Sequence, residues 1–418
     1  MASKVFIAAT GRNAGKTSVS LGLISFLVSK GYRVGYIKPL AQRHVRSGSR
    51  TVAEDALLMK KVFGLGGNLK DMGPFLMEKN QTTKYIEGKA KSPEGRILRA
   101  YRQIERESDV IVIEGTGHAG VGSIFDLSNA DVARLLNAPV VIVGEGGIGS
   151  TIDRLALNHS FFLSHGCSVL GMIVNKVRPE KYDRVCQLLR RASDKRRDLR
   201  ILGFIPHQSI LSAPTLSVVK DELRLRVLNE DVSNPTSVWN EQIENVVVAT
   251  MEPHEVMETV AGSQEKTLII TSSDRSDILL GALALYHSGV RNFVGLVLSG
   301  GPPARIIMDF IRGTGLPVLV AEQGIYRLAS LIHGLTVKTT AEDKAKIKIL
   351  TGLFMRHVAA EELCESIFAP HEMNLSWKAR MRSNLLAVSE FFSQVVASLR
   401  RSMEQFSGWI SPGGGNRC

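Results

Sequence analysis

Cysteine is scarce in this chain: its 418 residues include four cysteines, and none of them lies in a CxxC pair or at metal-ligand spacing. The scattered positions Cys167, Cys186, Cys364 and Cys418 argue against a disulfide framework and against a cysteine-based metal site. The amino-terminal residues lack the features of a secretory signal and lead directly into an expected strand. We therefore expect reduced thiols and a cytoplasmic location.

Long apolar runs and aromatic residues are also in short supply. No apolar run reaches the roughly 20 residues that a membrane-spanning helix needs, so a membrane is not an expected partner. Aromatic residues make up 6% of the chain and are not interleaved with its basic residues, as a surface that stacks nucleic-acid bases would require. The net charge of +12 is concentrated in residues 178–200 and in the last 40 residues or so. We interpret residues 178–200 as a solvated helix face, so nucleic acid is not expected either, although weak attraction to acidic partners stays open.

The remaining composition, 44% hydrophobic and 22% charged, is typical of a globular protein with two or three domains. Expected strands alternate with expected helices over the first 210 residues, and several strands are apolar on both faces. Such strands belong to a parallel sheet that is covered by helices on each side. These strands are expected at residues 5–9, 33–40, 109–115, 138–145, 169–176 and 201–207.

A second α/β pattern follows and predicts a smaller domain over residues 214–350, with strands at 244–251, 266–273, 293–301 and 317–322. The first domain then covers residues 1–213. Residues 351–418 are expected to form a helical extension, with an amphipathic helix over 384–404 and a disordered glycine-rich end. The predicted fold class is therefore α/β, with a mostly parallel sheet in the first domain.

The most informative motif follows the first expected strand, where residues 5–18 read VFIAATGRNAGKTS. Consecutive backbone N–H groups in a glycine turn can bind a phosphate, and the helix that follows adds the positive end of its dipole. The spacing is shorter than in the common pattern, because Thr10 stands where that pattern has glycine and Gly11 comes one residue later. The expected nucleotide-binding residues are Gly11, Arg12, Asn13, Ala14, Gly15, Lys16, Thr17 and Ser18.

Polar residues at strand ends complete this prediction. Lys38-Pro39, Glu114-Gly115 and Glu145-Gly146 each follow an apolar strand. Ligands of open parallel sheets bind at the carboxyl ends of the strands, so the chemistry is expected in these loops.

These motifs resemble a known family. TGRNAGKTSVSLG, the strand end IKPLAQ, EGTGHAG, GMIVNKV and LGFIPH are similar to the dethiobiotin-synthetase-like amino-terminal domain of long bacterial phosphate acetyltransferases. LIITSSDRSDILLGAL, LVLSGG and GLPVLVAEQGIY resemble the DRTGG domain that follows it there. The resemblance implies a P-loop NTPase-type first domain and a DRTGG-like second domain over about four-fifths of the chain. The catalytic acetyltransferase domain has no counterpart, so acetyl transfer by this chain alone is not expected.

The resemblance to dethiobiotin synthetase implies roles for individual residues. Lys16 is expected to contact the phosphates of ATP, and Thr17, Asp55 and Glu114 to surround Mg²⁺, which prefers oxygen ligands. Two of these residues also have structural interpretations. Glu114 can cap the turn after its strand, and Asp55 can be a first-turn helix acid that the helix dipole favours.

Two further residues correspond to functional positions of the synthetase. Lys38 matches a lysine near the reacting carbamate, where a cation offsets developing negative charge. It can equally be a second phosphate contact or a solvated strand end. Asn175 matches an asparagine that reads adenine, since an amide both donates and accepts hydrogen bonds. It can also be a common turn residue after a strand.

The resemblance is incomplete in two places. His118 interrupts the glycine-rich segment that follows Glu114, and no residues clearly match the diamine-substrate pocket of the synthetase. In the second domain, residues 272–277 lie between a strand and a helix. They fit either helix capping with a local Arg275 ion pair, or a contact with a small ligand or another domain.

We therefore hypothesise an ATP- and Mg²⁺-binding regulatory or sensor protein, with a small metabolite as a second effector and with homo-oligomers, as in related folds. The alternative is an ATP-dependent ligase of the dethiobiotin or cobyrinic acid diamide synthetase type, in which Lys16 and Lys38 are catalytic. A third hypothesis is a partitioning-type ATPase. It is weaker because the signature lysine of that group would fall at Gly11.

Overall fold

The computed structural model describes residues 2–196, 200–229, 236–335 and 337–369, and these form two compact units. Among the described residues, the first unit comprises those in 2–175, 183–204 and 357–369, and the second comprises those in 176–182 and 205–356. The amphipathic helix expected at 384–404 and the glycine-rich end lie outside the described residues. The predicted boundaries at 213 and 350 stay predictions.

A six-stranded sheet forms the centre of the first unit, in the order β2-β5-β1-β6-β7-β8. Pairing is parallel between β1 and its neighbours β5 and β6, between β2 and β5, and between β6 and β7. The central strands are buried along almost their whole length, which explains why their sequences are apolar on both faces. The strands are β1 (Ser3–Ala9), β2 (Val34–Ile37), β5 (Val110–Glu114), β6 (Val140–Glu145), β7 (Val169–Val177) and β8 (Ile201–Pro206).

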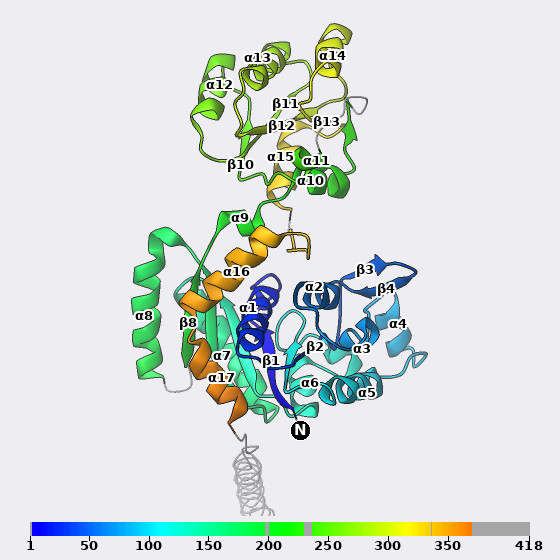
Figure 1. Ribbon diagram of the computed structural model, residues 1–418, viewed down its shortest axis with the longest axis vertical. Helices are drawn as coiled ribbons and strands as arrows, with labels where there is room; N and C mark the ends of the chain where they lie inside the picture. Colours follow the sequence, from blue (N-terminus) through cyan, green and yellow to red (C-terminus); the bar gives the residue numbers. More distant parts are fainter. Residues whose placement is uncertain (1, 197–199, 230–235, 336, 370–418) are drawn as a thin grey trace, which may run out of the picture. The chain divides into compact units, whose positions relative to one another are not determined.

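Helices connect these strands, and an antiparallel hairpin of β3 (His44–Ser47) and β4 (Arg50–Ala53) lies between β2 and the second helix. The chain order alternates strand and helix, as expected for parallel pairing (Figure 1). The helices are α1 (Lys16–Ser29), α2 (Glu54–Phe63), α3 (Leu69–Met72), α4 (Gln81–Ile86), α5 (Glu94–Glu105), α6 (Asn129–Leu135), α7 (Gly149–Ser164) and α8 (Tyr182–Lys195), with 3₁₀ turns η1 (Ser123–Phe125) and η2 (Pro179–Lys181).

The last described residues of the chain, 357–369, belong to the first unit. Helix α17 (Ala360–Phe368) packs against α1 and β1, with the rings of Tyr32 and Phe368 stacked at a centroid distance of 4.7 Å. Lys30 and Glu361 form an ion pair at 2.6 Å. Residues more than 300 positions apart in the sequence are therefore packed together in this unit.

The second unit contains a five-stranded sheet in the order β10-β11-β12-β13-β9, in which β9 is antiparallel to β13 and the other strands are parallel. Its strands are β9 (Arg226–Val227), β10 (Asn245–Val248), β11 (Thr267–Ser272), β12 (Phe293–Ser299) and β13 (Val318–Ala321). Its helices are α9 (Ser209–Ser212), α10 (Leu216–Leu223), α11 (Thr236–Trp239), α12 (Pro253–Gly262), α13 (Ser276–His287), α14 (Arg305–Arg312), α15 (Ile325–His333) and α16 (Lys344–His357).

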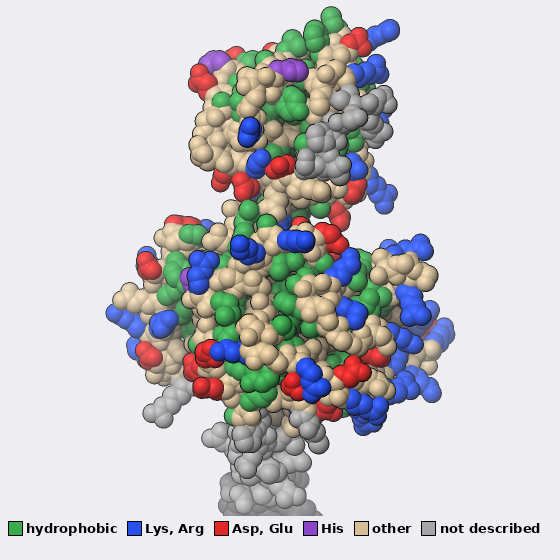
Figure 2. Space-filling view, viewed as in Figure 1, with side chains coloured by type: hydrophobic (Ala, Val, Ile, Leu, Met, Phe, Trp, Pro, Cys, Tyr) green, Lys and Arg blue, Asp and Glu red, His purple; other side chains and the backbone are tan. Residues whose placement is uncertain are grey.

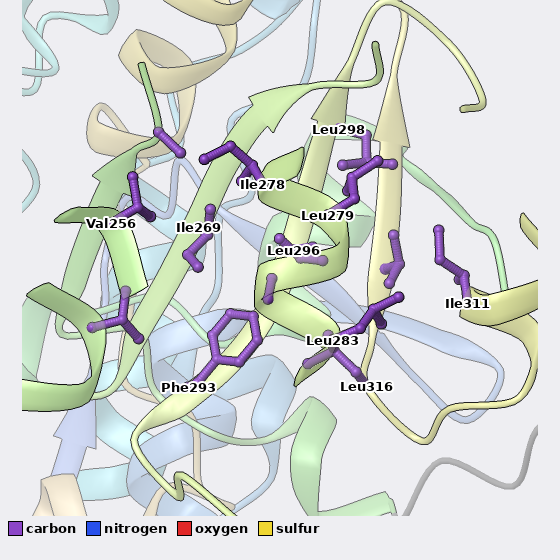
Figure 3. Packing of buried hydrophobic residues seen from close by; sticks show 14 of the residues in the cluster. Val256, Ile269, Ile278, Leu279, Leu283, Phe293, Leu296, Leu298, Ile311 and Leu316 are labelled. Carbon is purple, nitrogen blue, oxygen red and sulfur yellow. The ribbon is translucent and has the colours of Figure 1, made fainter. Parts of the chain in front are cut away.

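Two apolar cores, one on each face, stabilise this second sheet. On one face Ile269 and Leu296 pack with Val256, Ile278 and Ile311 from the covering helices (Figure 3). The other face packs against residues of α10 and α15. The predicted fold class is therefore confirmed: a mostly parallel α/β unit, a second α/β unit with a mixed sheet, and a helical carboxyl-terminal region.

Two groups of basic side chains stand out on the surface of the first unit. The exposed side chains of α8 include Arg184, Arg190 and Arg191, as expected for a solvated helix face. Figure 2 shows a second gathering of Lys and Arg side chains over β3, β4 and α4. Within residues 2–196, 200–229, 236–335 and 337–369, no helix is both long and apolar enough to cross a membrane.

Cys167 provides a test of the first core. Its side chain is buried, with a relative exposure of 6%, and burial raises the pKa of the thiol from 9.0 to about 12. Because the thiolate is the reactive form, we expect alkylation of Cys167 by iodoacetamide at pH 8.5 to be on the order of 1,000-fold slower in the folded protein than in urea. Peptide mass spectrometry measures this ratio, and comparable rates in both states would contradict the burial.

Candidate functional site

The turn between β1 and α1 brings the predicted phosphate-binding residues to the carboxyl edge of the first sheet. Asn13 and Gly15 both have positive φ angles, 60° and 99°, so the backbone adopts the left-handed conformation twice within three residues. A Cβ atom at position 15 would lie 1.9 Å from Nδ2 of Asn175, which leaves room only for glycine. The same Nδ2 donates a hydrogen bond to the carbonyl oxygen of Ala14 at 3.0 Å.

Lys16 is the first residue of α1, and its side chain lies across this turn. Its Nζ donates to the carbonyl oxygens of Gly11, at 3.2 Å, and Gly117, at 2.9 Å. The residue is 8% exposed. The ammonium group is thus held between the loop after β1 and the loop after β5, where a phosphate on the turn would be within its reach.

Thr17 connects the turn to two acidic residues from other elements. Its hydroxyl donates to Oε1 of Glu114 at 2.9 Å and lies 3.4 Å from Oδ1 of Asp55. Glu114 ends β5 and is fully buried, whereas Asp55 lies in the first turn of α2 and is 6% exposed. The three predicted metal-binding residues therefore meet at one point, and Asp55 also occupies the first-turn position that the helix dipole favours.

Lys38 lies between the same two carboxylates. Its Nζ is 2.7 Å from Oε1 of Glu114 and 2.9 Å from Oδ2 of Asp55, and the residue is 5% exposed. Burial by itself lowers the pKa of Lys38, but the two carboxylates together outweigh it, so the pKa is raised above its ordinary value. Lys38 is thus a charged, buried residue and not a solvated strand end.

Tyr36 is a site residue that the sequence reasoning missed. Its hydroxyl donates to Oε2 of Glu114 at 3.1 Å, so both oxygens of that carboxylate accept hydrogen bonds. Burial and the adjacent Glu114 charge raise the pKa of Tyr36 well above its ordinary value. Residues i and i+2 of a strand share a face, so the position of Tyr36 two residues before Lys38 was a usable signal.

The donor set fits Mg²⁺ in its chemistry. A hydroxyl and two carboxylates are hard oxygen ligands, and Mg²⁺ normally completes its shell with water and phosphate oxygens. Among the described residues, no group of three or more His, Cys, Asp or Glu side chains could hold a metal ion by itself. The site therefore offers a partial ligand set, which is what a metal that arrives with phosphate needs.

The sequence of this chain matches two family models. Residues 3–215, more than half of the chain, match the family model AAA_26, described as an AAA domain. The chain belongs to the AAA_26 family. Residues 226–335 match the DRTGG domain model. The predicted resemblance of a P-loop domain followed by a DRTGG domain is thereby confirmed.

This AAA_26 chain is similar to curated phosphate acetyltransferases over most of its length. It is 28% identical over 388 residues to the Pseudomonas aeruginosa enzyme, which covers 89% of this chain and 53% of the relative. It is 25% identical over 408 residues to the Escherichia coli K12 enzyme, with 89% and 54% covered. The chain therefore spans about half the length of the curated relatives it matches.

Solved structures also show similarity to parts of the chain. The MinC:MinD cell division protein complex of Aquifex aeolicus matches with a TM-score of 0.32 and 17% identity, over 53% of this chain and 89% of that chain. The CBS and DRTGG domains of Clostridium perfringens pyrophosphatase, complexed with the activator diadenosine tetraphosphate, match with a TM-score of 0.23 and 16% identity, over 40% and 83%.

The other predicted residues of the AAA_26 domain lie around the turn. Arg12 and Asn13 are exposed, Ala14 is buried, and Gly11 and Ser18 are half-buried. The contact of Asn175 with the Ala14 carbonyl gives that amide a place beside the turn, and its expected role toward adenine stays a prediction. All residues predicted for nucleotide and metal therefore gather at one edge of the sheet.

The loop after Glu114 is held by a residue that the sequence reasoning did not select. Asn129, at the start of α6, accepts from the Thr116 N–H at 3.0 Å and donates to the carbonyl oxygens of Thr116 and His118. The His118 side chain is exposed, and its Nδ1 accepts from the Gly120 N–H at 3.2 Å. The Asn129 side chain thus holds the backbone of the loop, and the His118 imidazole stays at the surface.

The corresponding strand end of the second unit contains a local ion pair. Arg275 Nη2 lies 2.8 Å from Oδ2 of Asp277 and donates to the carbonyl oxygen of Met251 at 3.1 Å. The Asp277 contact raises the pKa of Arg275, and the pKa of Asp277 is correspondingly lowered. The expected Arg275 ion pair is therefore observed, whereas the N-cap residue of α13, Arg275 itself, makes no capping hydrogen bond through its side chain.

Proposed function

We propose that this chain binds Mg-ATP in its AAA_26 domain and acts as a nucleotide-dependent regulatory module. The observation that carries the proposal is the meeting of Lys16, Thr17, Asp55 and Glu114 where β1 and β5 end. Ligands of open parallel sheets bind at this edge. The amide groups of the turn and the α1 dipole favour a phosphate, and the oxygen donors favour Mg²⁺ beside it.

The regulatory part of the proposal concerns the effect of nucleotide binding on the conformation of the chain. The AAA_26 domain shares the chain with a DRTGG domain, in an arrangement similar to about half of a phosphate acetyltransferase. Nucleotide bound at the turn would bias one conformation of the chain, and a small metabolite bound to the DRTGG domain would bias it further. We also propose that the chain forms a homo-oligomer, since related folds commonly do.

Lys16→Ala tests the nucleotide site. We expect Mg-ATP binding to weaken at least tenfold, about 1.4 kcal/mol, because the variant removes the ammonium group nearest the phosphate turn. Isothermal titration calorimetry of wild type, Lys16→Ala and the exposed-lysine control Lys91→Ala measures the change. Equal affinities of wild type and Lys16→Ala would remove the assignment of the turn.

A ligase is the second candidate, and the observation that favours it is the position of Lys38. A buried ammonium group beside the proposed metal ligands could offset the charge of a carboxylate as it is phosphorylated. This function predicts ADP release that depends on a small organic substrate and that Lys38→Met abolishes. Slow ADP release unaffected by a panel of carboxylates and amines would leave the regulatory module as the better account.

A further inference from the structure

The charged groups of the site balance one another without any bound ligand. Lys16, Lys38, Asp55 and Glu114 are 8%, 5%, 6% and 0% exposed, so all four are buried. Two positive and two negative side chains therefore share one poorly solvated region with a formal sum of zero. Added positive charge is unfavourable there unless negative charge enters with it, because burial penalises any net charge.

The Lys38 ammonium group contacts the two carboxylates that would ligate a metal. Its Nζ is within 2.9 Å of both Asp55 and Glu114, and it shares Oε1 of Glu114 with the Thr17 hydroxyl. The oxygen atoms that Mg²⁺ needs are thus already occupied by a cation from the chain itself. A metal ion and this ammonium group would compete for the same oxygens.

We propose that Lys38 is a resident cation that keeps the Asp55–Glu114 pair closed to metal until a nucleotide is bound. The inference rests on the proposed function and specifies its order of binding: the metal enters with the phosphates and not before them. Negative phosphate groups at the turn compensate the charge that the metal adds. They also offer the Lys38 ammonium group an alternative partner when it leaves the carboxylates.

Removal of the resident charge should therefore open the site to metal alone. In Lys38→Met the buried groups sum to one negative charge, and both carboxylates lose their ammonium contact. Titration of Mn²⁺ into nucleotide-free protein, followed by the loss of the free Mn²⁺ electron paramagnetic resonance signal, measures binding without any activity. We expect Lys38→Met to bind Mn²⁺ at least tenfold more tightly than wild type. We expect Lys38→Arg, which keeps the charge, to resemble wild type.

Controls separate the site from general charge effects and from misfolding. Lys91→Met removes one exposed positive charge and should leave Mn²⁺ binding unchanged. Asp55→Asn in the Lys38→Met background should abolish the gain. If Lys38→Met does not fold, Lys38→Gln is used in its place, because it is also neutral and keeps a polar side chain.

Wild-type protein gives an independent measurement. Tight Mn²⁺ binding by nucleotide-free wild type that is lost in Asp55→Asn would overturn the proposal, as would folded neutral variants that show no gain. Weak wild-type binding that strengthens at least tenfold in a neutral variant would support it. Failure of wild type to bind Mg-ATP would count against the proposed function instead, since none of these Mn²⁺ titrations contains nucleotide.

Discussion

Replacement of Glu114 with leucine is expected to lower the free energy of unfolding of the first unit by about 3 kcal/mol. The substitution removes one of the two carboxylates that compensate Lys38, and the ammonium group then lies buried with Asp55 as its remaining acidic partner. It also removes the acceptor of the Tyr36 hydroxyl group and the nearer of the two acceptors of the Thr17 hydroxyl group. Urea titration followed by hydrogen exchange of β1 and β5 peptides measures the loss in this unit separately from the second.

A double-mutant cycle distinguishes this cause from simple loss of packing. Lys38→Met removes the positive charge, so Glu114→Leu should cost less in that background than in wild type, and the two losses should not add. Strictly additive losses would show that Glu114 does not stabilise the fold through Lys38. Glu94→Leu, at the exposed start of α5, should change stability by no more than about 0.5 kcal/mol.

The main features of the fold were predictable because its signals are local. Strands such as Val110–Glu114 and Val140–Glu145 are apolar throughout, and buried parallel strands require this pattern. The hairpin at 44–53 was missed because its strands are short, polar and half-exposed, so they lack the alternation of a strand on an apolar core. The two-residue strand Arg226–Val227 was missed because it exists only through its pairing with β13.

Packing between distant parts of the chain could not be predicted, because it depends on residues that are far apart in the sequence. Gly203 forms a bridge with Val358, and a Cβ atom there would lie 2.2 Å from the carbonyl oxygen of His357. The role of this glycine depends on a segment more than 150 residues away. Neither its own sequence context nor that of His357 and Val358 indicates that the two segments meet.

Most of the residues that gather at the candidate site were selected from the sequence, but Tyr36 and the contacts among the residues were not. Glycine spacing and strand ends identified Lys16, Thr17, Lys38 and Glu114. The resemblance to dethiobiotin synthetase added Asp55 and Asn175. The sequence did not indicate that Lys38 bridges the two carboxylates, because that contact depends on the relative placement of β2, β5 and α2. It also did not indicate that the Asn175 amide faces the turn, because Asn175 is 161 residues away from Ala14 in the chain.

Gly15→Ala is expected to weaken Mg-ATP binding by about 2 kcal/mol or more, at least 30-fold. Position 15 has φ of +99°, which costs a residue with a side chain about 1–2 kcal/mol. The new methyl group would also meet Nδ2 of Asn175 at 1.9 Å. Asn175 could move only by giving up its hydrogen bond to Ala14, so the variant changes the backbone that the phosphate would contact. Calorimetry with Mg-ATP measures the loss.

The Asn175→Ala background separates backbone strain from the steric clash. There Gly15→Ala has no amide to displace, so its additional cost should fall to the backbone term of about 1–2 kcal/mol. Gly95→Ala is the matched control, because a Cβ atom at that helical position meets nothing within 4 Å and its φ is not positive. It should leave nucleotide binding unchanged. An equal cost of Gly15→Ala in both backgrounds would show that the contact with Asn175 does not contribute to the loss of nucleotide binding.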